Sequence, residues 1–159
     1  MGKKIKTNAM RILDAEQLTY EMISYNKDDG KIDGVSVAYK IGRPTEVVFK
    51  TLVAQGTSKN TYVFVIPVEA ELDLKRAAKA TNEKKIEMIA VKDIQKLTGY
   101  IRGGCSPIGM KKLYDTFVDN SAKHIKQIVV SGGKVGVQIE LKVEDLLKLT
   151  NGKLAELTK

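Results

Sequence analysis

The sequence Thr98-Gly99-Tyr100-Ile101-Arg102-Gly103-Gly104-Cys105-Ser106-Pro107-Ile108-Gly109 is the stretch around which the rest of the chain is organised. Its four glycines, its proline and its small polar residues lie between two segments with the patterns of regular structure. Its backbone can therefore approach a ligand closely and direct N–H groups at it. Lys111 and Lys112 follow and add positive charge, which suits an anionic ligand. The stretch indicates either a binding loop or a structural turn between strands.

The segments before this loop alternate between the periodicities of helices and strands. We expect helices at 8–16, 35–41, 73–80 and 91–97, and strands at 18–25, 46–54, 61–68 and 86–89. Asn8 and Asp73 are the expected N-caps. Gly42 and Gly99 are expected to end the second and fourth helices. The strands at 46–54 and 61–68 should pair as a hairpin.

The segments after the loop indicate more strands and a helical C-terminus. We expect strands at 113–118, 127–130 and 135–140, a helical turn at 121–125, and helical segments from residue 144 that include a last turn with Leu154 and Leu157. The turn between the last two strands is expected at 131–134. Strands neither alternate strictly with helices nor dominate, so an α+β fold with a mixed or antiparallel sheet is predicted. The length of 159 residues predicts a single domain over 1–159.

The amino-acid composition favours some classes of binding partner over others. The 27 Lys plus Arg against 19 Asp plus Glu give a formal charge of +8, which favours a polyanion such as nucleic acid. Aromatic residues make up only 6%, which argues against a surface that stacks many single-stranded bases. No apolar run approaches the roughly 20 residues of a membrane span. A single cysteine fits a reducing compartment, so we expect a cytoplasmic location with no membrane partner.

Several kinds of active site are disfavoured. One histidine, His124, and one cysteine, Cys105, cannot form a clustered zinc site, so we expect neither a metal nor a cofactor. His124 lies between lysines in a polar segment and is expected on the surface, and Cys105 has no obvious base beside it in the sequence. The segment 131–134 lacks features of a nucleotide phosphate loop. What remains is a pocket of backbone N–H groups with one strand lysine, which can polarise an ester without supplying a nucleophile.

Several motifs in order along the chain resemble those of one family. They are Phe49-Lys50-Thr51-Leu52, Leu72-Asp73-Leu74-Lys75, Lys84-Lys85-Ile86-Glu87-Met88, Thr98-Gly99-Tyr100 with Gly103-Gly104-Cys105-Ser106-Pro107-Ile108-Gly109, and Val130-Ser131-Gly132-Gly133-Lys134. With these motifs the chain resembles the YbaK/EbsC family of aminoacyl-tRNA deacylases, which is related to the editing domain of bacterial prolyl-tRNA synthetases. The resemblance implies a mixed, largely antiparallel and partly barrel-like sheet surrounded by helices.

The resemblance also implies the site residues. Lys50 matches the lysine that the family needs, Gly103 its loop glycine, and Ser131 its hairpin serine. Gln138 stands where the most similar branch has an aspartate, which bears on substrate choice. We expect the catalytic residues to be Lys50, Gly103 and Gly104, and the substrate-binding residues to be Tyr25, Thr51, Pro67, Ser106, Ser131 and Gln138. Candidate tRNA contacts are Lys75, Arg76, Lys79, Lys111 and Lys112, for which solvated surface is the alternative.

The implied activity is the hydrolysis of mischarged aminoacyl-tRNA, with cysteine misloaded on proline tRNA as the first substrate. The thiol of the substrate would attack its own ester carbonyl, so no protein nucleophile is required. Two alternatives stay open: a deacylase that clears alanine or another small amino acid with activated water, and a tRNA-binding or regulatory module without catalysis. The implied partners are aminoacyl-tRNA and prolyl-tRNA synthetase.

Overall fold

The computed structural model describes residues 6–159 and contains two open β-sheets. A three-stranded antiparallel sheet has the order β1 (Tyr20–Ser24), β7 (Val137–Lys142), β6 (Gln127–Lys134). A five-stranded sheet has the order β4 (Ile86–Met88), β2 (Phe49–Gly56), β3 (Thr61–Pro67), β5 (Asp115–Asp119), β8 (Lys153–Ala155). In this second sheet β4, β2 and β3 pair antiparallel, whereas β3, β5 and β8 pair parallel.

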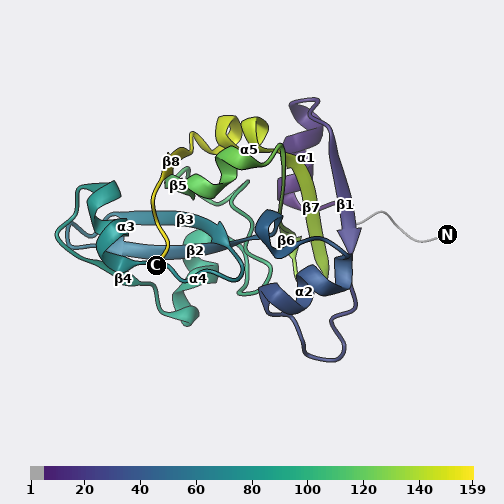
Figure 1. Cartoon of the computed structure of the whole chain (residues 1–159), viewed down its shortest axis with the longest axis horizontal. Coiled ribbons are helices and arrows are strands. Elements are labelled where there is room, and N and C mark those ends of the chain that lie inside the picture. The colour runs from purple at the N-terminus through teal and green to yellow at the C-terminus, as the bar shows by residue number, and fades with distance from the viewer. Residues whose placement is uncertain (1–5) are drawn as a thin grey trace.

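Helices lie around the two sheets (Figure 1). They are α1 (Asn8–Ala15), α2 (Gly34–Ile41), α3 (Leu74–Thr81), α4 (Val91–Thr98) and α5 (Val143–Thr150), with 3-10 turns at Thr45–Val47 and Asn120–His124. In Figure 1, α1 and α2 lie beside the three-stranded sheet, and α3 and α4 lie near β2 and β4. The largest buried cluster joins residues of α1, β2, β3, β6, β7 and α5, so one core holds both sheets together.

Helix ends follow the predicted chemistry with one correction. The Asp73 carboxylate accepts hydrogen bonds from the N–H groups of Lys75 and Arg76, which confirms it as an N-cap. Gly42 and Gly99 end α2 and α4 in the left-handed conformation, as expected. Asn8 is not the N-cap of α1; the hydroxyl of Thr7 accepts from the N–H of Met10 instead. The Asn8 side chain donates to the carbonyl of Gly109, far along the chain.

Two local predictions near the C-terminus are wrong. The expected last helical turn is partly the strand β8, which pairs with β5 at the register Val118 to Leu154. The segment 131–134 is not the turn between the last two strands, because β6 continues through it with a register irregularity between Ser131 and Lys134. The turn therefore falls at residues 135–136, where Gly136 has a φ of +95°. The other expected elements are present with shifted ends.

Strand β2 connects the two sheets. It belongs to the five-stranded sheet, and Val48, just before it, forms a parallel bridge with Val129 of β6. The predicted mixed, largely antiparallel sheet with helices around it is confirmed, but both sheets are open, so the barrel-like closure is not seen among residues 6–159. In the same residues no helix is long and apolar enough to cross a bilayer.

Candidate active site

One edge of β2 has two different partners, β4 and β6, and the gap between them leaves space for a site. The opposite edge of β2 pairs with β3 along its whole length. The first edge is covered by β4 only from Ala54 onwards, with one further bond from the N–H of Ile89 to the carbonyl of Val53. The bridge to β6 lies at Val48. The part of the edge around Thr51 is therefore left between two partners.

The hydrogen-bond parity of the hairpin shows which main-chain groups face this gap. The N–H of Val68 donates to the carbonyl of Val48 at 2.9 Å, and that of Gly56 donates to Asn60 at 3.0 Å. In an antiparallel pair, hydrogen-bonded positions alternate along the strand, so the even-numbered residues of β2 bond to β3. Thr51 lies at an odd position. Its N–H and C=O therefore point away from β3, toward the gap.

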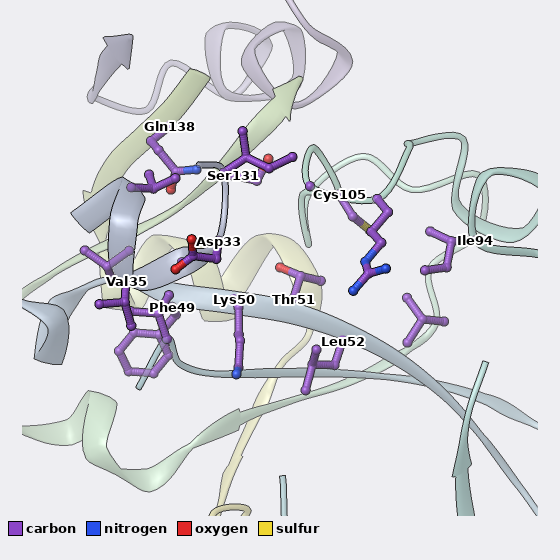
Figure 2. Close-up of a pocket in the computed structure, with 18 of the residues that line it drawn as sticks. Asp33, Val35, Phe49, Lys50, Thr51, Leu52, Ile94, Cys105, Ser131 and Gln138 are labelled. Atoms are coloured by element: carbon purple, nitrogen blue, oxygen red, sulfur yellow. The ribbon is translucent and has the colours of Figure 1, made fainter. Parts of the chain in front are cut away.

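A pocket of about 520 Å³ fills this gap (Figure 2). It is lined by Val48 and by residues 49–53 of β2, by residues 32–35 and 37 of α2 and the loop before it, and by Val91 and Ile94 of α4. The remaining walls come from the glycine-rich loop and the three-stranded sheet, through Arg102, Gly103, Cys105, Ser131, Gln138 and Tyr25, together with Val68, Met88 and Ile89. The pocket thus unites segments that are far apart in the sequence.

Two hydroxyl groups in the pocket lack hydrogen-bond partners. The oxygens of Tyr25 and Thr51 are buried, and neither has a partner among the described residues. A buried polar group without a partner costs free energy, commonly about 1–3 kcal/mol. Together with its main-chain groups, which point away from β3, the Thr51 hydroxyl therefore offers polar groups to a bound polar molecule.

Lys50 lines the same pocket as Gly103. Its side chain and that of Thr51 leave β2 in opposite directions in Figure 2, as successive residues of a strand do. Within the described part of the chain, no hydrogen bond or ion pair engages the Lys50 amine. The Lys50 amine, which Figure 2 shows directed away from Ser131 and Cys105, therefore has no partner among the described residues and can bind a ligand that reaches it.

The glycine-rich loop contributes less bare main chain than the sequence indicated. Gly103 lines the pocket and has a φ of +85°, a conformation that favours glycine. The N–H of Gly104 donates to the carbonyl of Ile101 at 3.0 Å, so it is not free to hold a carbonyl group of a substrate. Ser106 is fully buried, and its hydroxyl accepts from the N–H of Ile108. Neither Gly104 nor Ser106 lines the pocket, and Pro67, paired with Phe49 at the end of β3, does not either.

The two residue types that commonly act as nucleophile and base are poorly placed here. Cys105 lines the pocket, and burial raises the pKa of its thiol to about 11. The thiol is therefore neutral at physiological pH and packs with Val53 and Tyr100. His124 is exposed in the 3-10 turn, as expected, and does not line the pocket.

Ser131 and Gln138 form one wall of the pocket. They are paired across β6 and β7, and Figure 2 shows them at the same side of the space. The Ser131 hydroxyl accepts from the N–H of Gly133 at 3.2 Å, which supports the irregularity in β6. Gln138 is buried and uncharged. This wall is thus polar but neutral.

Two charged residues of the pocket were missed by the sequence analysis. Asp33 precedes α2, and Arg102 lies in the glycine-rich loop at 98–109. Among residues 6–159 no hydrogen bond or ion pair engages the Arg102 guanidinium. Arg102 could have been predicted, because it is a cation inside a loop that was predicted to bind an anion. For Asp33, the sequence indicated at most the N-cap of a helix.

The candidate tRNA contacts lie outside the pocket. All five are exposed, and two of them have partners within the protein. Arg76 donates to the carbonyl of Thr158 at 2.9 Å, and Lys111 donates to the carbonyl of Lys96 at 3.2 Å. Lys75, Lys79 and Lys112 have no such contacts within the described chain.

Comparison with known proteins identifies the family. Residues 34–149 match the model of the aminoacyl-tRNA editing domain. The chain belongs to this family. A protein of Enterococcus faecalis, named "Putative Cys-tRNA(Pro)/Cys-tRNA(Cys) deacylase EbsC", is 46% identical to this editing domain over 153 residues, which cover 96% of this chain and 93% of that protein. The resemblance to the YbaK/EbsC family is thereby confirmed.

More distant relatives share parts of the sequence or the fold. A proline–tRNA ligase of Caldicellulosiruptor bescii is 34% identical to the editing domain over 70 residues, which are 44% of this chain and 11% of the ligase. A crystal structure of a hypothetical protein has a TM-score of 0.87 at 20% identity and covers 96% of this chain and all of that one. A crystal structure described as a "putative trans-editing enzyme for prolyl tRNA synthetase" has a TM-score of 0.82 at 20% identity. The match covers 98% of this chain and 99% of that one. These structures support the fold.

Proposed function

We propose that this protein is a trans-editing deacylase that releases cysteine from mischarged Cys-tRNA(Pro). The proposal is supported by the family and by the relative that is 46% identical over nearly the whole chain. The observation that carries the chemistry is a pocket with polar groups whose described lining residues include a neutral thiol and no histidine. Its one thiol, on Cys105, has its pKa raised to about 11 by burial, and the only histidine lies elsewhere.

The missing nucleophile is then supplied by the substrate. The sulfur of the cysteinyl group attacks its own ester carbonyl carbon, the bond from that carbon to the ribose oxygen breaks, and the thiol proton passes to the ribose oxygen. The products are a cyclic thiolactone, which water opens to cysteine, and free tRNA. A well-oriented intramolecular attack can reach an effective molarity of about 10⁵ M or more, so holding the ester in the right conformation supplies most of the acceleration.

The pocket offers groups for each step. The N–H of Thr51, which faces the pocket, and that of Gly103 are donors for the oxygen that becomes negative as the sulfur attacks. The Lys50 amine is a cation for that charge or for the phosphate of the tRNA terminus. The buried hydroxyls of Tyr25 and Thr51 would gain the partners that they lack. Ser131 and Gln138 would form the wall against the amino-acid side chain.

The alternative of a water-activating deacylase for alanine needs a general base in the pocket. Asp33 carries the one carboxylate among the described lining residues, and hydrogen bonds from Ser36 hold its pKa below the usual value. A carboxylate with a lowered pKa is a weaker base, which disfavours activation of water by this group. Cysteine therefore stays the preferred substrate.

The decisive experiment compares cysteinyl- and alanyl-tRNA with the wild-type protein and Lys50→Ala. We expect release of cysteine but not of alanine, and a loss of about 100-fold or more in the variant because a group that stabilises developing charge is removed. Lys148→Ala, an exposed lysine of α5 outside the pocket, is the matched control and should keep the wild-type rate. Release of alanine would favour the water mechanism, and tRNA binding without release of either amino acid would favour a non-catalytic module.

A second experiment tests the participation of the substrate thiol. Seryl-tRNA has a hydroxyl in place of the thiol, and a hydroxyl is a far weaker nucleophile at neutral pH. We expect the serine ester to be cleaved at least about 100-fold more slowly than the cysteine ester. Equal rates for the two esters would contradict attack by the substrate thiol while leaving deacylation itself intact.

We also propose prolyl-tRNA synthetase as a partner that contributes tRNA selection. The support is the similarity of 70 residues to part of a proline–tRNA ligase, which links this family to that enzyme class. A pull-down with tagged synthetase and proline tRNA should retain the protein more strongly than a pull-down with tRNA alone. Equal retention would argue that the protein selects tRNA without the synthetase.

A further inference from the structure

The charges in the pocket divide into two cations and one anion. Lys50 and Arg102 are the cations. Of the described residues that line the pocket, Asp33 alone carries a carboxylate, and Figure 2 shows it between Lys50 and the wall formed by Ser131 and Gln138. Because Gln138 is neutral, Asp33 is the one pocket group with a charge that attracts a cation.

The Asp33 carboxylate is held in place and is anionic. Its oxygens accept from the N–H of Ser36 at 3.1 Å and from the Ser36 hydroxyl at 2.7 Å, which fixes it at the N-terminus of α2. These bonds are the main reason that its pKa lies below the ordinary value. No ion pair within 4 Å neutralises it in the part of the chain that the structure describes. A carboxylate has four lone-pair sites, so it can accept further hydrogen bonds.

The proposed substrate carries a positive group that needs such a partner. An aminoacyl ester has an ammonium group on the carbon next to the reacting carbonyl, and Lys50 and Arg102 repel it. We propose that Asp33 binds the α-ammonium group of the aminoacyl ester and so fixes the ester for attack. This inference rests on the proposed function and makes Asp33 a positioning residue that selects esters with a free amino group.

Asp33 is also a helix cap, so the test must separate its charge from its structural role. Asp33→Asn keeps a good cap and removes the charge. The experiment measures kcat/KM for Cys-tRNA and for N-acetyl-Cys-tRNA, which has the same tRNA and thiol but no ammonium. We expect the wild type to have a higher kcat/KM for Cys-tRNA than for N-acetyl-Cys-tRNA. In the variant, kcat/KM should fall about tenfold for Cys-tRNA and stay unchanged for N-acetyl-Cys-tRNA. The effect is moderate because Asp33 is exposed and water screens part of the attraction.

Asp73→Asn is the matched control. It makes the same chemical change at another helix N-cap outside the pocket, so it should leave the preference for the free amine unchanged. Asp33→Ser, which also caps, is the second variant if Asp33→Asn fails to fold. The inference is overturned if kcat/KM of the folded variant falls by the same factor for both substrates, or falls for neither. If the wild type cleaves neither ester, the proposed function itself fails.

Discussion

At the scale of single residues, Cys105 shows how burial sets the chemistry. Its thiol lies in a small apolar cluster, and burial raises its pKa from 9.0 to about 11. A group whose pKa is higher in the folded state adds stability below its unfolded pKa and loses it as pH rises. Folding should therefore become less favourable between about pH 9 and pH 11 through this residue.

A titration of thiolate absorbance checks this prediction. The spectrum of Cys105→Ala is subtracted from that of the wild type at each pH. The tyrosine absorbance cancels because both proteins contain the same tyrosines, and the difference reports Cys105 because the chain has a single cysteine. We expect a midpoint near pH 11 in the folded protein and near pH 9 in denaturant. A folded midpoint near pH 9 would show that the thiol is not buried as described.

The same residue gives a prediction for activity. If the substrate supplies the nucleophile, Cys105→Ala should keep deacylase activity within about threefold, because only packing is lost. The measurement is kcat/KM for Cys-tRNA beside that of Lys50→Ala. A loss in Cys105→Ala as large as that in Lys50→Ala would point to Cys105 as a nucleophile.

Sequence reasoning reached some of these residues and not others for physical reasons. Lys50 stood out because a charge interrupts a strand of β-branched and apolar residues, and Thr51 came with it through the family resemblance. Asp33 was missed because its neighbours predict only a helix cap, while its place in the pocket depends on how α2 packs near β2. Gly104 was expected to donate to the substrate, but a local turn bond to Ile101 uses its N–H.

At the scale of elements, the glycine-rich loop is held against the turn between β6 and β7. A Cβ atom added at Gly104 would lie 2.8 Å from the nitrogen of Val135 and 2.9 Å from the carbonyl carbon of Lys134. Both are backbone atoms, so relief requires movement of the loop or the turn. Gly104→Ala should lower stability by about 1–3 kcal/mol and reduce deacylation by displacing Gly103 from the pocket.

Denaturant unfolding and kcat/KM measure this effect, and Gly30→Ala is its control. Gly30 has a φ of +76° and nothing within 4 Å of its added Cβ, so alanine there introduces backbone strain without a clash. That control should lose about 1–2 kcal/mol of stability and little activity. If both variants keep the wild-type activity, close packing of the loop on the turn is not needed for the site.

The elements themselves were predictable where the signals are local. Asp73, Gly42 and Gly99 mark helix ends through bonds within a few residues of themselves. The strand β8 could not be found in this way, since its three residues become a strand only through pairing with β5. The irregularity in β6 likewise depends on its register with β7.

At the scale of the whole molecule, the pocket exists because β2 serves two sheets. Its partners on one edge, β6 at Val48 and β4 from Ala54, leave Thr51 uncovered between them. The walls of the pocket therefore come from both sheets and from α2 and α4. Local sequence patterns predicted the strands other than β8, but the gap between the two sheets follows from their long-range pairing.

The charge of the whole molecule gives the last prediction. A net charge of +8 should make tRNA affinity fall with salt, because each phosphate contact releases counterions. If the exposed lysines contact phosphates, Lys75→Ala with Lys79→Ala should reduce the slope of log affinity against log salt by about 2. Lys111→Ala with Lys112→Ala tests the second candidate set in the same assay, and Lys148→Ala with Lys153→Ala, on α5 and β8, is the control with equal charge loss. Equal slope changes in all three pairs would mean that net charge, rather than a defined face, binds the tRNA.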